Sequence, residues 1–438
     1  MQLIDGFSKL SRAKKLDWLK KQAGLSDSTL KILDDHLHSD GGTQEIYDDL
    51  SENTVSNFYL PLGLAPNFLI NGKVMTLPMV TEESSVVAAA SRSAKFWTVH
   101  GGFHASVKGH SKVGQVHFTW SGDRDELYRV FERSRERMVR SVRSLTNRMD
   151  QRGGGISSME IRSTNPGLPG TYSLFVDFNT ADAMGANFIN SVLEELAQQL
   201  SEIMTGSGAK GEMDVLMSIL SNYTPDNIVQ CYAEGEVKIF EEMGGGFSPL
   251  QFAERFRKAV DIANHDPYRA VTHNKGIFNG MDAVIMATGN DFRAVEACGH
   301  AYASREGSYR SLSSVELSEQ AFRFTLEVPL AVGTVGGLTG IHPVAAASLE
   351  ILGKPSAEEL MQVVAAAGLA THFSAVRALI TSGIQEGHMK MHLGNILRQL
   401  HASKSESEIT RHYFSSRRVS YSEVALYLDS LRKQNQEE

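Results

Sequence analysis

The sequence feature that most constrains this chain is a charged segment running from Asp266 to Asp291. It reads DPYRAVTHNKGIFNGMDAVIMATGND, so that two cations, Arg269 and Lys275, lie within seven residues and an acid ends the segment. A lysine buried in such a segment needs a compensating anion, and Asp291 is the local candidate. Spacing alone leaves two interpretations open. Lys275 could stabilise a developing oxyanion while Arg269 binds a substrate carboxylate, or the segment could be an ordinary surface loop with ion pairs.

Three glycines divide the same segment. Gly276, Gly280 and Gly289 predict sharp turns and a close approach of the backbone to other groups. Met281–Thr288 is an apolar run, which is typical of a buried strand or of the start of a helix. The segment is therefore predicted to combine turns, buried backbone and charged side chains.

Composition limits the class of protein. A chain of 438 residues is too long for one ordinary hydrophobic core, which predicts two or three domains. Its 42% apolar and 21% charged residues are typical of a soluble globular protein, and its net charge of −8 argues against a nucleic-acid or membrane partner. Two cysteines, Cys231 and Cys298, allow neither a disulfide framework nor a thiolate metal cluster, which fits a reducing cytoplasm. We expect no signal peptide and no run of the roughly 20 apolar residues that span a bilayer.

Alternating polar and apolar residues divide the middle of the chain into strands and helices. Strands are predicted at VGQVHFTW, ISSMEIR and TYSLFVDF, a long helix at RDELYRVFERSRERMVRSVRSL, and a second helix after DAMGAN. This order predicts a small α+β unit with its helices on one face of an antiparallel sheet. The predicted fold class is α+β. The unit at 110–220 is inserted between the two parts of a large helix-rich domain, 1–109 and 221–377, and a helical segment follows at 378–438.

A polar cluster, EESS at 82–85, stands directly before the small apolar residues VVAAAS. Acids at the start of a helix commonly interact with the helix dipole, which is the simpler interpretation. Small residues would also let the helix lie deep in the core. A carboxylate held there, such as that of Glu83, can keep a proton and act as an acid.

The motif DAMGAN at 182–187 follows a predicted strand and opens a helix. Gly185 lets the backbone approach a ligand closely, and the free N–H groups of the helix start can bind a pyrophosphate. The alternative is an ordinary turn at the start of a helix. The motif is not G-x-G-x-x-G, so a Rossmann domain is not indicated.

Near the C-terminus, GIQEGHMKMH carries His388 and His392 on one face of a predicted helix, a spacing found in zinc sites. The sequence has no glutamate between them as in H-E-x-x-H, and it shows no third ligand. No metal is therefore expected, and a structural histidine is the alternative to a functional one.

Six blocks, in this order along the chain, resemble the signature of the class II 3-hydroxy-3-methylglutaryl-coenzyme A (HMG-CoA) reductases, and the resemblance covers nearly the whole sequence. The blocks are EN at 52–53 with LPLGLAPNF at 60–68, EESSVVAAAS at 82–91, DAMGAN at 182–187, THNKGIFNG with ATGNDFRAVEACGHAYA at 272–303, GTVGG at 333–337 and GIQEGHM at 383–389.

The resemblance implies roles for particular residues. The implied catalytic residues are Glu83, Lys275, Asp291 and His388. The implied substrate ligands are Ser85, Arg269 and Asn279, and the implied cofactor ligands are Asp182, Met184, Gly185, Asn187 and Arg148.

The resemblance also implies a reaction, the four-electron reduction of HMG-CoA to mevalonate and CoA with two NAD(P)H and no metal. In it Lys275 stabilises the oxyanion, Asp291 orients Lys275, Glu83 supplies a proton to the alcohol and His388 protonates the CoA thiolate. The implied architecture is a large domain with a ferredoxin-like dinucleotide-binding insert, a C-terminal helical flap, and an active site between two subunits of a homo-oligomer.

The segment SLTNRMDQRGGG lies where the family reads the adenosine ribose. Arg148 and Arg152 favour the 2′-phosphate of NADPH, whereas Asp150 would favour NADH, so the expected cofactor is NADPH or NADH with a lean to NADPH. Two further functions stay open. The same site could oxidise mevalonate, or the chain could be a non-catalytic homologue that binds acyl-CoA.

The chain departs from the family at two places. Ser84 replaces the usual proline before the helix, and Thr371-His372 replaces the usual Gln-Asn. The second change could alter a contact with the cofactor or substrate.

Overall fold

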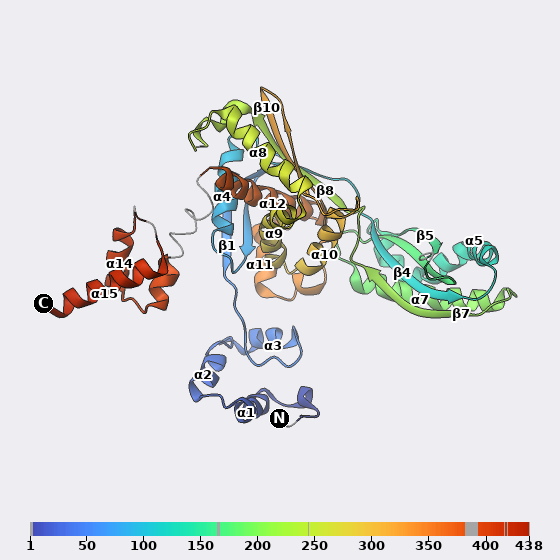
Figure 1. The fold of residues 1–438 in the computed structure, drawn as a ribbon. Coiled ribbons are helices and arrows are strands. Elements are labelled where there is room, and N and C mark those ends of the chain that lie inside the picture. Colours follow the sequence, from blue (N-terminus) through green and yellow to red (C-terminus); the bar gives the residue numbers. More distant parts are fainter. Residues whose placement is uncertain are drawn as a thin grey trace.

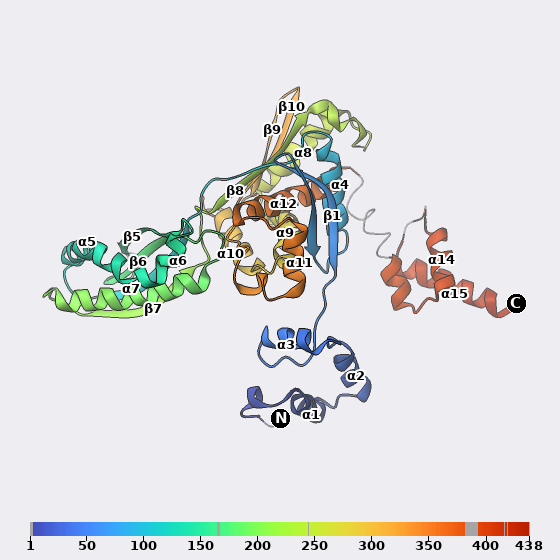
Figure 2. The same cartoon turned by 180° about the vertical axis from the view of Figure 1, so that it is seen from behind.

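A computed structural model describes residues 3–163, 167–243, 245–381, 393–415, 417 and 419–437. The predicted α+β class is confirmed: a central body of helices and sheet carries an N-terminal lobe, a smaller sheet domain and a pair of C-terminal helices on different sides (Figures 1 and 2).

The central body is built on a four-stranded antiparallel sheet in the order β3-β8-β10-β9. Alternate residues of β10 are buried, so Phe322, Phe324 and Leu326 face the core. Three long helices, α8, α9 and α12, pack around the same core. The bounds of these elements are β3 (His104–Val107), β8 (Ile228–Glu236), β9 (Ser313–Leu317), β10 (Ala321–Pro329), α8 (Pro249–His265), α9 (Pro267–Ala287) and α12 (Ala357–Ile380).

Helix α9 takes in nearly all of the charged segment without interruption, so the turns predicted at Gly276 and Gly280 are wrong. A Cβ atom at Gly276 would lie 2.9 Å from Nδ1 of His372, and one at Gly280 would lie 2.4 Å from the carbonyl oxygen of Ala367, both on α12. These glycines let two helix backbones approach closely. Gly289, just beyond α9, does form a turn, with a left-handed φ of 69°.

Helix α12 corrects the expectation that no segment could span a bilayer. It is long and apolar enough to do so by length and composition, but 72% of its most apolar window is buried inside the protein. The many alanines of α12 explain why it is both apolar and buried. Their small side chains let α9, α4 (Val86–Thr98) and the sheet pack against α12 from several sides.

A hairpin of β1 (Leu62–Ile70) and β2 (Lys73–Val80) packs against α4 and α9 and completes the body. The remaining elements of the body are η2 (Val237–Glu242), α10 (Phe292–Ala303), η3 (Gly337–Thr339) and α11 (Pro343–Ile351). Helix α8 begins as the sequence predicts, with Ser248 as the N-cap residue and Pro249 in the first turn.

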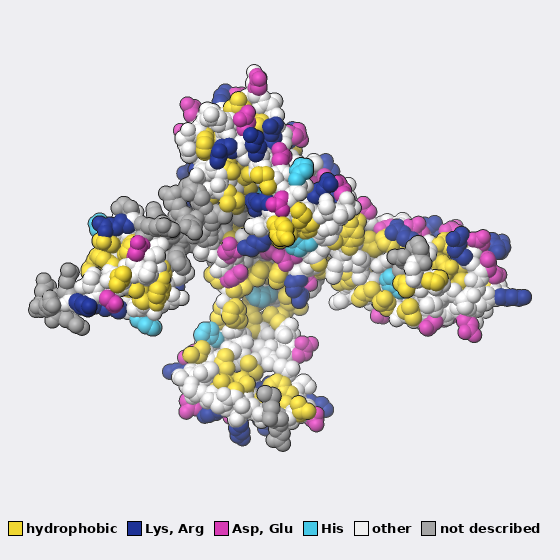
Figure 3. Space-filling view, in the orientation of Figure 1, with side chains coloured by type: hydrophobic (Ala, Val, Ile, Leu, Met, Phe, Trp, Pro, Cys, Tyr) yellow, Lys and Arg dark blue, Asp and Glu magenta, His cyan; other side chains and the backbone are white. Residues whose placement is uncertain are grey.

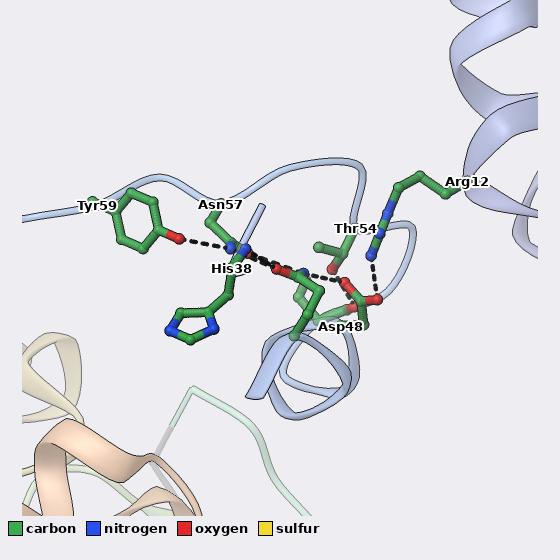
Figure 4. A network of polar contacts seen from close by, with 8 residues as sticks. Arg12, His38, Asp48, Thr54, Asn57 and Tyr59 are labelled. Carbon is green, nitrogen blue, oxygen red and sulfur yellow. Dashed lines mark hydrogen bonds and ion pairs between the residues drawn. The ribbon is translucent and has the colours of Figure 1, made fainter. Parts of the chain in front are cut away.

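The N-terminal lobe contains η1 (Phe7–Lys9), α1 (Arg12–Ala23), α2 (Asp27–Asp35) and α3 (Gly41–Asp49). A polar network ties these helices to the segment that leads into the body (Figure 4). Gln44 is buried at its centre, donates a hydrogen bond to the Asp48 carboxylate (2.7 Å) and accepts one from the Asn57 amide (2.8 Å), while Arg12 pairs with Asp48. Buried amides with such partners specify one arrangement of the lobe.

The smaller domain has the ferredoxin-like order of strands. Its antiparallel sheet is arranged β5-β6-β4-β7, and the chain passes through it as strand, helices, two strands, helix and strand. A separate core that includes Val116, Leu174 and Leu193 lies between sheet and helices. Its elements are β4 (Lys112–Trp120), α5 (Arg124–Ser141), α6 (Arg143–Asp150), β5 (Gly155–Ser163), β6 (Thr171–Asn179), α7 (Ala186–Gly206) and β7 (Met213–Ser221).

Two details of this domain differ from the sequence prediction. The long helix is broken at Val142, whose side chain is fully buried, into α5 and α6. The edge strand β7 was missed, because its alternation is weak: Leu216, Met217 and Ile219 are all exposed by about half.

The C-terminal helices α14 (Lys404–Tyr413) and α15 (Tyr421–Glu437) share a small apolar core of their own, which includes Ile396, Phe414 and Val424. A flap that closes over the site stays a prediction.

Candidate active site

Lys275 and Glu83 form an ion pair, although 192 residues separate them in the sequence. Lys275 Nζ lies 2.5 Å from Glu83 Oε2. Lys275 projects from the middle of α9, and Glu83 stands two residues before the N-cap residue of α4. The packing of α4 on α9 therefore brings together two of the four predicted catalytic residues.

Lys275 is not a buried lysine, because its side chain is 58% exposed. Its anionic partner within the chain is Glu83, and a contact with Asp291 stays a prediction. Helix α9 turns its apolar side to the core and leaves Lys275 and Asn279, one turn apart, on its less buried face. Asn279 is thus placed beside the ion pair, as a substrate ligand would need to be.

Asp291 is the N-cap residue of α10. Its carboxylate accepts hydrogen bonds from the backbone N–H groups of Arg293 (3.0 Å) and Ala294 (3.2 Å) and pairs with the Arg293 side chain. Twelve residues of α9 separate Lys275 from Ala287, which at the helical rise is about 18 Å. Within the described residues of one chain, no hydrogen bond or ion pair joins Asp291 to Lys275.

Ser85 carries backbone strain at the start of α4. Its φ of 79° is left-handed, an uncommon conformation for a residue with a side chain. As N-cap residue it forms no side-chain cap hydrogen bond, which leaves the N–H groups of the first turn to other partners. Such strain concentrates at binding and catalytic sites, so the position suits a substrate ligand.

Arg269 lies in the first turn of α9 and forms no ion pair with any described residue. Desolvation lowers the pKa of its guanidinium group below the usual range. A cation that is partly buried without an acid beside it is suited to bind an incoming carboxylate.

Beside Arg269, two buried histidines form a pair that the sequence did not predict. His273 Nε2 lies 2.9 Å from His372 Nε2 and 2.8 Å from Ser313 Oγ, and neither Nδ1 atom has a partner among the described residues. Burial, and the charge of Arg269 after it, lowers the pKa of His273 to about 3, and burial also lowers the pKa of His372. Both imidazoles are therefore neutral. His372 belongs to Thr371-His372, one of the two places where the sequence departs from the pattern that it resembles.

We expect this pair to make the protein sensitive to acid. An imidazole that stays neutral when folded but takes up a proton when unfolded lowers stability as pH falls below its ordinary pKa of 6.5. The free energy of unfolding should fall by about 1.4 kcal/mol per pH unit for each histidine. Urea unfolding between about pH 7.5 and about pH 5.5 checks this. In His372→Asn, the dependence of the free energy of unfolding on pH should be smaller by the contribution of one histidine, about 1.4 kcal/mol per pH unit.

His265→Asn, a change at an exposed histidine of α8, is the matched control and should leave the slope unchanged. Equal slopes in wild type and His372→Asn would contradict the assignment.

A second unpredicted pair consists of two acids, and one of them, Asp282, lies on the face of α9 that carries Lys275. Burial, and then the adjacent Glu296 of α10, raises the pKa of Asp282 to about 8. Its Oδ1 atom is buried and has no hydrogen-bond donor among the described residues. Asp282 follows Asn279 after three residues, so Lys275, Asn279 and Asp282 form one polar stripe. The spacing of Asp282 on this stripe is the signal that could have found it.

The predicted cofactor motif forms the turn between β6 and α7. Gly185 has a φ of 86°, and a Cβ atom there would lie 2.4 Å from the Thr180 side chain, so only glycine fits. Asp182 accepts a hydrogen bond from the backbone N–H of Ala357 at the start of α12 (2.8 Å). The motif thus lies between the two domains, with Met184 and Asn187 on either side of Gly185.

Three glycine-containing blocks meet at this point. The backbone of Asp182 accepts a hydrogen bond from Thr334 in GTVGG (2.8 Å), and Gly333 N donates to the Asn290 side chain in ATGND (2.8 Å). A Cβ atom at Gly333 would lie 2.3 Å from the backbone nitrogen of Met184. The turn that bears Asp291 and the candidate cofactor turn therefore lie close together, beyond the C-terminal end of α9.

A cavity of about 370 Å³ opens beside this turn. It contains the buried ammonium group of Lys112 and the guanidinium group of Arg152, and Asp182 lines it. Cations, a turn with free N–H groups and a position where a Cβ atom would not fit suit a phosphate-bearing dinucleotide. Arg148 is exposed on α6 and does not line the cavity, and His388 lies outside the described residues.

Comparisons with known proteins agree on one family. A family model described as hydroxymethylglutaryl-coenzyme A reductase matches residues 11–393. The 3-hydroxy-3-methylglutaryl-coenzyme A reductase of Archaeoglobus fulgidus is 37% identical over 394 residues, 90% of this chain and 86% of that protein. A probable reductase of the same name from Borreliella burgdorferi is 32% identical over 363 residues, 83% of this chain and 81% of that protein.

Solved structures are similar as well. A class II 3-hydroxy-3-methylglutaryl-CoA reductase from Streptococcus pneumoniae, bound to NADPH in open conformations, has a TM-score of 0.72 and 37% identity, and the match covers 86% of this chain and 99% of that one. A second structure of the enzyme from that organism has a TM-score of 0.73 and 35% identity over 98% of this chain and 99% of that one. This chain belongs to the hydroxymethylglutaryl-coenzyme A reductase family, and its similar structures are those of class II.

Proposed function

We propose that this protein reduces HMG-CoA to mevalonate and CoA with two equivalents of NAD(P)H. The observation that carries the proposal is the Glu83–Lys275 pair at 2.5 Å, an acid and an ammonium group in contact on the polar stripe of α9. The proposed direction is reduction rather than oxidation of mevalonate, because the related proteins are named reductases.

The proposed chemistry gives each of these side chains one role. The bound dinucleotide supplies hydride. Lys275 donates a hydrogen bond to the thioester oxygen as negative charge develops there, and the exposed end of its side chain leaves room for that oxygen. The C–S bond of the first intermediate then breaks, and His388 protonates the CoA thiolate as it leaves. The aldehyde that remains would take a second hydride, and Glu83, in contact with Lys275, would protonate the resulting alkoxide to the alcohol.

The substrate's free carboxylate needs a cation, and Arg269 and Ser85 are the proposed ligands. Arg269 has no acid of its own among the described residues, and the first turn of α4 beyond Ser85 offers backbone N–H groups. Asn279, one helical turn beyond Lys275, completes the polar contacts.

We further propose that the complete site needs two copies of the chain. Asp291 cannot reach Lys275 within one chain, but it lies at the same end as the cofactor turn. A second copy would bring Asp291 and the dinucleotide to the Glu83–Lys275 pair. Apolar side chains at the surface of the N-terminal lobe and the body support such an interface (Figure 3), among them Phe58, Leu64 and Val74.

One assay tests the activity. The purified protein should oxidise NAD(P)H only when HMG-CoA is present, with two dinucleotides consumed per HMG-CoA and with free CoA released. A protein that binds HMG-CoA but oxidises no dinucleotide would contradict the proposal and favour a non-catalytic acyl-CoA-binding role.

The cofactor preference has its own test. If Arg148 on α6 binds the 2′-phosphate of NADPH, Arg148→Ala should lower kcat/KM for NADPH by roughly tenfold or more and leave that for NADH within about twofold. Arg143→Ala, an exposed arginine of the same helix, is the control. A wild-type enzyme with strong preference for NADH would count against Arg148 as a phosphate ligand.

A further inference from the structure

Lys112 is a buried cation without an acid beside it. Only 6% of the residue is exposed, and Nζ donates hydrogen bonds to Thr180 Oγ1 (2.6 Å) and to the carbonyl oxygen of Ala183 (2.7 Å). Both acceptors are neutral, and no described carboxylate lies within ion-pair distance of Nζ. Burial alone lowers the pKa of Lys112 to about 8, which agrees with the absence of a near acid among the described residues.

A charge in this position is costly unless an anion joins it. Removing an ammonium group from water costs several kcal/mol, which neutral hydrogen-bond acceptors offset only in part. A hydrophobic residue at the end of β4 would make a more stable protein. A lysine retained there therefore points to a ligand, because functional sites are where such destabilising groups persist.

The cavity beside Lys112 identifies the class of ligand. Its volume of about 370 Å³ is in the range of small-molecule sites. Arg152 lines it as a second cation. Of the two acids that line it, Asp182 accepts from Ala357 N, and Glu358 pairs with His110 at 3.0 Å. Lys112, Arg152 and Asp182 have no charged partner among the described residues, which leaves two positive charges against one negative charge, so the cavity favours an anion.

Two substrates of the proposed reaction carry phosphate, the dinucleotide and CoA. The position of the cavity favours the dinucleotide. Four consecutive lining residues, 179–182, run from the end of β6 into the turn before α7, and Lys112 itself holds that turn through Thr180 and Ala183. All of these residues belong to the inserted domain rather than to the region of Glu83 and Lys275.

We propose that Lys112 is a cofactor-binding residue whose ammonium group contacts a phosphate group of the nicotinamide dinucleotide in this cavity. The inference rests on the proposed function and adds to it a residue on β4 that lies outside the motif at 182–187. Before the cofactor binds, Lys112 holds the turn; when the cofactor binds, its phosphate supplies the missing negative charge.

The test compares binding and stability in the full-length protein. Lys112→Met removes the charge but keeps a long side chain. We expect at least a tenfold rise in the Kd for NADPH and NADH, measured by nicotinamide fluorescence, and no more than a twofold change in the Kd for CoA. The Tm without ligand should stay the same or rise, because an uncompensated charge has been removed. Lys112→Arg should retain most of the affinity.

Lys210→Met, which removes an exposed lysine of the same domain, is the matched control and should change none of these values. Lys112→Gln serves as a second neutral variant if the methionine variant folds poorly. The inference is overturned if dinucleotide affinity is unchanged, if CoA affinity falls equally, or if both neutral variants lose the fold. Were the wild type to bind no dinucleotide at all, the proposed function itself would fail.

Discussion

Lys275→Ala is expected to lower kcat by about a hundredfold to a thousandfold while the protein keeps its fold. The loss follows from the removal of the cation that stabilises the oxyanion, since removal of one such donor costs about a hundredfold to a thousandfold in rate. Stability should change little, because Lys275 is 58% exposed and its partner Glu83 is 37% exposed. HMG-CoA-dependent loss of nicotinamide absorbance measures the rate, and thermal unfolding measures stability.

The matched control is Lys258→Ala, a change at an exposed lysine of α8, which should retain the wild-type rate. The Kd for NADPH should also be the same in Lys275→Ala and wild type, because the cofactor turn lies beyond the C-terminal end of α9, away from Lys275. A Lys275→Ala variant with a rate near that of wild type would remove this residue from the mechanism.

Local pattern was sufficient to predict several features of this fold. The N-cap serine of α8, the strand before DAMGAN and the helix after it depend on residues adjacent in the sequence, and each is found where it was expected. The motif order was sufficient for the family, since six blocks in sequence are more specific than any one of them.

What could not be predicted depends on tertiary packing. The glycines of α9 suggest turns when read locally, but their reason lies on α12, about ninety residues away in the sequence. Likewise, the sequence offers Asp291, at the end of the segment, as the partner of Lys275, whereas the acid in contact with Lys275 within the chain is Glu83. The pairing of His273 with His372 also joins distant segments, and no periodicity indicates it.

Lys275 and Asp291 lie too far apart along α9 to meet within one chain, and two inactive variants can test how the site is assembled. If each complete site takes Glu83 and Lys275 from one copy and Asp291 from another, then Lys275→Ala and Asp291→Ala mutate different halves of it. A heterodimer of the two variants would contain one site with both mutations and one with neither. Random association makes half of the dimers mixed, each with one intact site of two.

Co-expression or mixed refolding of Lys275→Ala with Asp291→Ala should therefore restore about a quarter of the wild-type kcat, from variants that are each nearly inactive. Glu83→Gln with Lys275→Ala is the matched control. These residues lie 2.5 Å apart in the same chain and thus belong to the same half, so that pair should restore nothing. Gly185→Val, which blocks the cofactor turn, should complement Lys275→Ala but not Asp291→Ala. The turn and Asp291 lie close together, so one copy contributes both of them to the same site. Recovery in every pair, or in none, would place Asp291 and Lys275 in a site built differently from the one proposed.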